Sequence, residues 1–290
     1  MKTIVIAAGY ATRLYPLTEN FPKPLLQIGK STILDRLLDD IDTIPEIDEH
    51  IIVTNGKFAP IFEDWAKDRC GSGVSSGKSS TSFHPSHNFP SKNCGPLPFK
   101  RPRAATDFPE DTPKPQGTIK PITVINDGTF TNETRLGAVC DLLFAMEKLN
   151  IDDDLLVVAA DNILDFSFRG FVEYAKEKQT SCIMCHYEPE IYKLQRTGVI
   201  EVDEDMRVLQ MQEKPQVPVS HWAVPPFYVY LRKDLDLVRH SVENGCGKDA
   251  PGNLAHYMVE HTTMHAWPMP AGRFDIGSLD TYEEAKQKYK

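Results

Sequence analysis

The stretch TIVIAAGYATRLYPLTENFPKPLLQIGKSTIL, residues 3–34, determines how the rest of the chain is interpreted. Residues 3–8 form a short apolar run of the kind expected for a buried parallel strand. The small-residue turn at 9–13 follows at once, and such a turn leaves backbone N–H groups free to face an anion. Because Arg13 and Lys23 add two cations and three prolines restrict the loop, we expect a polyphosphate ligand.

Apolar patterns beyond this stretch alternate between helices and strands. Residues 33–44 have helical spacing with Ser31 or Thr32 as candidate caps, residues 49–55 resemble a strand, and residues 58–67 resemble a helix. The β-α-β-α order predicts an α/β fold with a mixed, mostly parallel central sheet flanked by helices. Further strands are expected at 119–126, 154–160, 181–187, 198–202, 208–212, 226–231 and 264–269, and further helices at 135–149, 168–178, 235–244, 253–261 and from 280.

Residues 70–118 break this pattern. These 49 residues hold eight serines, eight prolines and five glycines, with almost no apolar periodicity. Such a composition cannot offset its ordering entropy by burial. We therefore predict one domain over residues 1–290, interrupted at 70–118 by a disordered insertion.

Charge and composition limit the classes of partner. The net charge is −9 and the pI is near 5.5, which argues against nucleic-acid binding and against binding to an anionic membrane. No apolar run is long enough for a membrane span, and no leader peptide is evident, so we expect a cytoplasmic protein. Cys182 and Cys185 form a lone C-x-x-C inside an apolar stretch, which we interpret as two core residues of a strand.

Two carboxylates are placed where a metal would be useful. Asp161 directly follows the apolar run at 154–160, and ligands of open α/β sheets bind at the carboxyl ends of strands. A carboxylate there can hold Mg²⁺ against phosphate oxygens, although an Asp at this position could also cap the next element. Asp275 lies far along the chain in GRFDIGSLD, where it could equally belong to a loop that enters a helix. Two such acids suit one hard cation.

Four motifs together resemble the sugar-1-phosphate nucleotidyltransferases, also called nucleotide-sugar pyrophosphorylases. The N-terminal stretch, here called the signature loop (residues 6–26), matches nearly every fixed position of L-A-A-G-x-G-T-R-L-x-P-x-T followed by P-K-P-L-L; one departure is Ala11, which replaces the second Gly. Ala is comfortable there only if its φ is negative. The other three matches are Asp161, where the family has G-D; Glu213-Lys214-Pro215, its E-K-P; and Asp275-Ile-Gly277, its W/F-x-D-I-G-T. The resemblance covers all of the chain but the insertion.

The resemblance implies a role for each matching residue. Arg13 and Lys23 would be the catalytic residues, and Asp161 and Asp275 would hold Mg²⁺. Asn162, Glu213 and Lys214 would bind the sugar phosphate. The nucleotide would be bound by the signature loop and by backbone groups where the helix after residue 134 begins, through Ala8, Gly9, Tyr10, Ala11, Thr12, Leu136 and Gly137.

The implied reaction joins an NTP and a sugar 1-phosphate into an NDP-sugar, releases pyrophosphate, and is compatible with a homo-oligomer. One alternative is a cytidylyltransferase for a non-sugar phosphate such as phosphocholine, whose ammonium would need an aromatic cage that Trp222, Phe227 and Tyr228 could supply. Another is a nucleotide-sugar-binding regulatory protein on the same fold, because fold does not determine function.

Overall fold

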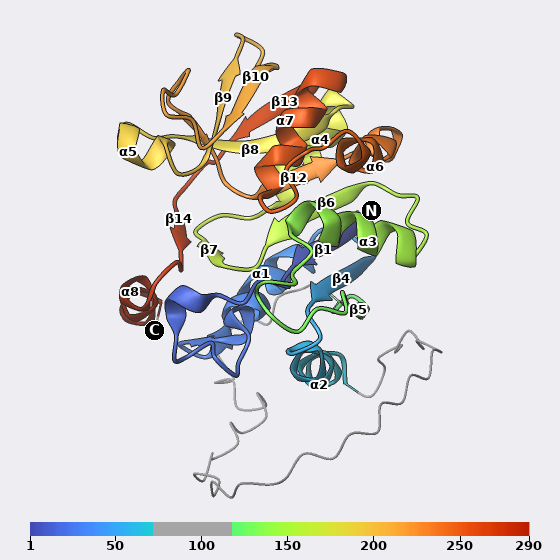
Figure 1. Ribbon diagram of the computed structural model, residues 1–290, viewed down its shortest axis with the longest axis vertical. Helices are drawn as coiled ribbons and strands as arrows, with labels where there is room; N and C mark the ends of the chain where they lie inside the picture. Colours follow the sequence, from blue (N-terminus) through green and yellow to red (C-terminus); the bar gives the residue numbers. More distant parts are fainter. Residues whose placement is uncertain (72–117, 290) are drawn as a thin grey trace, which may run out of the picture.

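The computed structural model describes residues 1–71 and 118–289 (Figure 1). The expected insertion at 70–118 therefore lies almost entirely outside the described residues; Cys70 is the last residue of helix α2. The helices are α1 (Ile33–Ile41), α2 (Ala59–Cys70), α3 (Ala138–Lys148), α4 (Arg169–Lys178), α5 (Ile191–Leu194), α6 (Asp236–Glu243), α7 (Pro251–His261) and α8 (Leu279–Lys288), with 3₁₀ turns at Thr12–Leu14, Lys23–Leu25 and Arg232–Asp234.

Each expected strand is present, and five further strands of two or three residues were not expected. They are β1 (Lys2–Ile6), β2 (Gln27–Ile28), β3 (Ser31–Thr32), β4 (Glu49–Thr54), β5 (Ile122–Asn126), β6 (Leu155–Ala159), β7 (Asn162–Leu164), β8 (Ser181–Tyr187), β9 (Gly198–Val202), β10 (Val208–Glu213), β11 (Trp222–Val224), β12 (Phe227–Tyr230), β13 (Met264–Pro268) and β14 (Arg273–Asp275). Cys182 and Cys185 are both buried in β8, as expected for core residues. Among the described residues, no helix combines the length and the apolarity needed to cross a bilayer.

Ten of the described strands form one mixed sheet, which confirms the predicted fold class. The order is β10-β9-β11-β8-β12-β6-β1-β4-β5, with β13 beside β8. The half that contains β6, β1, β4 and β5 is parallel, and the half around β8 to β12 is mostly antiparallel. Helices cover both faces, since α1, α2 and α4 pack on the side of one core cluster and α3, α6 and α7 on the other (Figure 1).

The sheet divides next to the end of β6. Strands β11 and β12 both pair with β8, and only Pro225 and Pro226 separate them. The opposite edge of β12 pairs with β6, whereas the opposite edge of β11 pairs with β9. Consequently the carboxyl end of β6 lies beside the amino end of β9 and the carboxyl end of β10. Residues from both halves of the sheet can therefore line one site.

The C-terminal helix packs against the N-terminal loops. In Figure 1 the red α8 lies near the blue segment that follows β1. A small apolar cluster joins the two, and the Tyr282 hydroxyl donates to the carbonyl oxygen of Gln27 at 2.8 Å. The helix expected from residue 280 begins at Leu279, and Ser278 caps it with a capping box to Thr281. The short side chain of Ser278 accepts from the third N–H of the helix.

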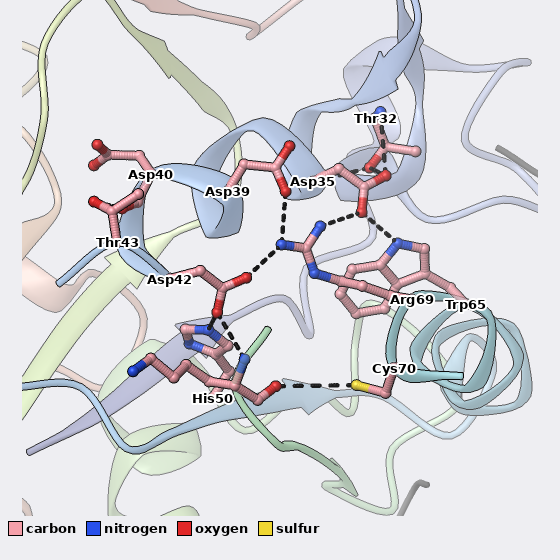
Figure 2. Close-up of polar contacts among 11 residues, drawn as sticks. Thr32, Asp35, Asp39, Asp40, Asp42, Thr43, His50, Trp65, Arg69 and Cys70 are labelled. Carbon is pink, nitrogen blue, oxygen red and sulfur yellow. Dashed lines mark hydrogen bonds and ion pairs between the residues drawn. The ribbon is translucent and has the colours of Figure 1, made fainter. Parts of the chain in front are cut away.

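A buried arginine ties α1 to α2. The Arg69 guanidinium donates to Asp35 at 3.0 Å, to Asp39 at 2.7 Å and to Asp42 at 2.8 Å (Figure 2). Asp42 also bonds the His50 ring and accepts from the backbone N–H of Lys120, each at 2.9 Å. Burial opposes the charge of Arg69, but the surrounding carboxylates, Asp39 first, raise its pKa. This cluster therefore holds α2 and the approach to β5 against α1.

Asp141 is the buried carboxyl group with the most perturbed titration. It lies in the first turn of α3 with 3% of its surface exposed, and its Oδ1 has no hydrogen-bond partner among the described residues. Burial, followed by repulsion from Asp127, raises its pKa to about 7. The folded protein therefore binds a proton that the unfolded chain has already lost between about pH 4 and pH 7.

The Asp141→Asn variant should remove this proton linkage. The raised pKa of Asp141 in the folded protein stabilises the fold only while the carboxyl group is protonated. The free energy of unfolding of the wild type therefore falls as the pH rises from about 4 to about 7, by on the order of a few kcal/mol. The melting-temperature difference between variant and wild type should thus grow in favour of the variant from pH 4 to pH 8. Asp68→Asn, at an exposed acid on α2, is the control for loss of one charge. A difference that stays constant with pH would contradict the assignment.

Candidate active site

Two short strands bring the two predicted metal-binding acids together. Strands β7 and β14 pair antiparallel, with Asp275 opposite Asn162, and the backbone N–H of Ile276 donates to the carbonyl oxygen of Asp161 at 3.0 Å. Asp161 and Asp275 are 114 positions apart in the sequence but therefore adjacent in the fold. Desolvation, and next the charge of Asp161, raise the pKa of Asp275 above its usual range.

Cations surround this acidic pair. The ammonium of Lys23 donates to Oδ2 of Asp161 at 3.0 Å, and the Lys23 side chain is 11% exposed. The charges of Arg273, Lys23 and Arg13 offset part of the rise in the pKa of Asp275. Arg13 is exposed and forms no ion pair within residues 1–71 and 118–289. Both predicted catalytic residues thus lie at the acidic pair, and Arg13 remains available to a ligand.

The donor set fits a hard divalent cation that retains other ligands. Two carboxylates that repel each other gain from a cation between them, and Mg²⁺ in proteins is commonly held by one or two carboxylates plus phosphate oxygens and water. A group of three or more potential metal-ligating side chains does not occur in the described part of the chain. The two carboxylates would therefore supply part of the coordination of such a cation, with water or phosphate oxygens as its further ligands.

The signature loop presents backbone rather than side chains. Within the described residues, the N–H groups of Gly9, Tyr10, Ala11 and Thr12 donate no hydrogen bond. The loop is supported from below, where the Asn55 side chain donates to the carbonyl oxygen of Ala8 at 2.9 Å. The ring of Tyr10 is buried against the ring of Phe58, which anchors the loop to the core. Free N–H groups after a strand are suited to a phosphate.

The start of α3 is fixed by the loop before α7. Gly137 has a φ of 90°, and a Cβ there would lie 2.6 Å from the carbonyl oxygen of Lys248. The N–H of Val139 donates to that same oxygen at 3.0 Å. The N–H groups of Leu136 and Gly137 donate to no described residue. The predicted backbone contact of these two positions with a nucleotide stays a prediction.

Glu213 lies at the edge of a polar cavity. Its side chain is 17% exposed, packed so closely against Gly252 that a Cβ there would lie 1.9 Å from Oε2. Lys214 has a φ of 50° and its ammonium stays 3.6 Å from Glu213 with a largely exposed side chain. The cavity has a volume of about 400 Å³ and is lined by Glu213, Asn244, Gly245, Cys246, Gly247, Asn253, His256 and Tyr257. The cavity thus lies between the end of β10, the loop after α6 and helix α7.

Asn162 and Arg273 form part of the site in a way that the sequence did not indicate. The buried Asn162 amide donates to Oδ1 of Asp161 at 2.7 Å, and its oxygen accepts from Arg273 at 2.6 Å. Its predicted contact with a sugar phosphate stays a prediction. Arg273 was not among the expected site residues, although it occupies the position of the aromatic residue in W/F-x-D-I-G-T. That replacement was the one signal in the sequence.

Comparison with known proteins places the chain in a defined group. A family model described as nucleotidyl transferase matches residues 2–84 and 112–290. The glucose-1-phosphate adenylyltransferase of Fervidobacterium nodosum is 22% identical over 97% of this chain and 59% of its own length. The bifunctional protein GlmU of Methanococcus aeolicus is 48% identical over 82% of this chain and 42% of its own length. The chain thus spans about half the length of these two curated relatives.

Other relatives correspond to the chain over their whole length. The UTP–glucose-1-phosphate uridylyltransferase AglF of Haloferax volcanii is 19% identical over 99% of this chain and 96% of its own length. The crystal structure of UDP-glucose pyrophosphorylase complexed with UDP-glucose superposes with a TM-score of 0.71 at 18% identity, covering 99% of this chain and 97% of that chain. At this identity the likeness supports the fold alone.

Replacing Ala11 with Gly should stabilise the protein. Ala11 has a φ of 47° and a ψ of 44°, so it occupies the left-handed region that the sequence analysis named as uncomfortable for Ala. Its carbonyl oxygen is held there by the Thr18 hydroxyl at 2.8 Å. We expect Ala11→Gly to raise the free energy of unfolding by about 1 kcal/mol, measured by urea denaturation. Ala8→Gly, at a position without positive φ, should lower it; equal losses from both changes would argue against strain at Ala11.

Proposed function

The chain belongs to the nucleotidyl transferase family, and we propose that it transfers a nucleoside monophosphate from an NTP to a sugar 1-phosphate, releasing pyrophosphate and an NDP-sugar. The observation that carries this proposal is the meeting of Asp161 and Asp275 across β7 and β14, with Lys23 bonded to Asp161. Phosphoryl-type transfer needs positioning and charge stabilisation more than covalent chemistry, and the site is built from charged groups at strand ends.

Each side chain has a proposed task in this reaction. An oxygen of the sugar phosphate attacks the α-phosphorus in line, and pyrophosphate leaves. Arg13, which has no ion pair among the described residues, holds the β- and γ-phosphates and the charge that develops on the leaving group. The signature-loop N–H groups bind the nucleotide phosphates, and the backbone at Leu136 and Gly137 contacts the base. Lys214 holds the phosphate of the sugar, beside Glu213 at the edge of the cavity.

Asp161 and Asp275 would hold Mg²⁺ in this proposal. When bound, the cation would neutralise phosphate charge in the site. Lys23, whose ammonium donates to Oδ2 of Asp161, would stabilise the charge of the α-phosphate beside that carboxylate. Asn162 donates to the other oxygen, Oδ1, so both oxygens of Asp161 have a defined partner within the described part of the chain.

The phosphocholine alternative has less support. Of the three residues that could form an aromatic cage, Phe227 and Tyr228 are 0% and 2% exposed, and both belong to the core. The cavity beside Glu213 is instead lined by amide, hydroxyl, imidazole and carboxylate groups, which suit the hydroxyls of a sugar. A purely regulatory role has no specific support, because Arg13, Lys23, Asp161 and Asp275 are all present and adjacent.

A substrate panel tests the function. ATP, CTP, GTP, UTP and dTTP would each be combined with hexose 1-phosphates, amino-sugar 1-phosphates and phosphocholine in the presence of Mg²⁺, with pyrophosphate release as the readout. We expect release with at least one NTP and a sugar 1-phosphate, and a matching NDP-sugar by mass spectrometry. Release with phosphocholine alone would replace the sugar by the alternative acceptor, and no release with any pair would refute the enzymatic function.

Lys23 and Lys214 should differ in the kinetic parameter that they affect. Lys23 is placed where charge changes most during transfer, so Lys23→Ala should lower kcat by about 100-fold or more. Lys214 holds the acceptor phosphate before the reaction, so Lys214→Ala should mainly raise KM for the sugar phosphate, by about tenfold, and leave KM for the NTP nearly unchanged. Lys286→Ala removes an exposed ion pair on α8 and is the control. If Lys214→Ala raised only KM for the NTP, the acceptor would bind elsewhere.

A further inference from the structure

A chain of hydrogen bonds crosses the site from β14 to the signature loop. Arg273 donates through Nη1 to Oδ1 of Asn162 at 2.6 Å, and Asn162 donates through Nδ2 to Oδ1 of Asp161 at 2.7 Å. The remaining carboxylate oxygen, Oδ2, accepts from Lys23 at 3.0 Å. Both oxygens of Asp161 thus accept a hydrogen bond. One accepts from the ammonium of Lys23, and the other accepts from the neutral amide of Asn162, which in turn accepts from the guanidinium of Arg273.

The direction of this chain is determined at Arg273. A guanidinium group only donates and an ionised carboxylate only accepts, so the amide between them has a single orientation that satisfies both. Its oxygen must face Arg273, and its NH₂ group must face Asp161. If a neutral side chain replaced Arg273, the amide oxygen would lose its obligatory donor and the orientation of Asn162 would no longer be imposed from outside.

Burial gives this orientation its energetic weight. Asn162 is 2% exposed, so an amide group that loses a partner cannot regain it from bulk water. The backbones on either side are fixed by the register of the two strands, in which Arg273 pairs with Leu164 and Asp275 pairs with Asn162. Strand pairing therefore sets the position of both side chains, and their hydrogen bond sets the orientation of the amide.

We propose that Arg273 is a positioning residue that orients the Asp161 carboxylate through Asn162. Asn162 in turn serves the carboxylate rather than acting as an independent ligand of the sugar. The inference rests on the proposed function in one respect, namely that Asp161 holds the divalent cation. Partners of metal-ligating carboxylates commonly change metal affinity when they are removed, by about 10- to 100-fold.

A double-mutant cycle tests the pathway through Asn162. Mn²⁺ binding to the free protein would be measured by the EPR signal of unbound Mn²⁺ for wild type, Arg273→Gln, Asn162→Ala and the double variant. We expect each single variant to weaken Mn²⁺ binding by about tenfold, and the double variant to be no weaker than the worse single one. Losses that multiply in the double variant, or an unchanged affinity in Arg273→Gln, would overturn the proposal.

Two further variants separate positioning from folding and from charge. Arg273→Lys keeps one cationic donor and should restore part of the affinity lost in Arg273→Gln; if the Gln variant does not fold, Arg273→Lys takes its place in the cycle. Arg232→Gln removes an exposed ion pair with Asp152 and is the matched control, with Mn²⁺ binding expected to equal that of the wild type. Loss of a cation makes the protein more negative and so cannot weaken Mn²⁺ binding through net charge; an equal loss in Arg232→Gln would therefore mark a nonspecific effect of substitution and reject a positioning role.

Wild-type pyrophosphate release distinguishes this inference from the proposed function. If the Arg273 and Asn162 variants are non-additive in Mn²⁺ affinity but the wild type releases no pyrophosphate with any substrate pair, the positioning role stands and the proposed function is refuted. If the wild type is active but the two variants act independently, only the positioning role is refuted. Wild-type protein that binds no Mn²⁺ contradicts the metal site itself, and the positioning role fails with it.

Discussion

The pairing of β14 with β7 is the constraint on which the site depends. Three residues of each strand suffice to bring Asp275 next to Asp161 from 114 positions away, and the N–H of Ile276 adds a further backbone bond to Asp161. The same pairing anchors the chain that leads into α8, whose apolar face packs against the N-terminal loops. The signature loop, the carboxyl end of β6 and the C-terminal segment therefore form one unit, although they lie at the start, middle and end of the sequence.

Charge balance connects this unit to its proposed chemistry. Two carboxylates meet with Lys23, Arg13 and Arg273 around them, and the raised pKa of Asp275 reflects desolvation first and the charge of Asp161 second. The split of the sheet between β6 and β9 adds Glu213 and Lys214 from the antiparallel half, because only two prolines separate the strands that pair with each half. One half of the sheet thus supplies the phosphate-binding loop and the acids, and the other supplies the polar cavity.

Sequence reasoning located most of the fold because the long elements have clear periods. Thr32, one of the two candidate caps, is the N-cap of α1, and β8 occupies the expected residues 181–187. The strands β7, β11 and β14 were not foreseen, since three residues are too few to show alternation and their pairing is a tertiary event. Motifs sufficed to name four site residues, Asp161, Asp275, Arg13 and Lys23. The hydrogen bond between Arg273 and Asn162 could not be predicted, because it depends on a strand register that no motif specifies. Ala at position 11 was expected to be comfortable only with a negative φ. The observed φ of 47° shows that tertiary contacts override the local preference of Ala.

We infer that Asp161 and Asp275 act as one metal-binding pair beside the nucleotide phosphates. Anomalous diffraction from crystals grown with Mn²⁺ and the NTP that the protein uses would locate the metal. We expect one strong peak within bonding distance of both carboxylates. A peak that contacts neither carboxylate, or only one of them, would contradict the inference.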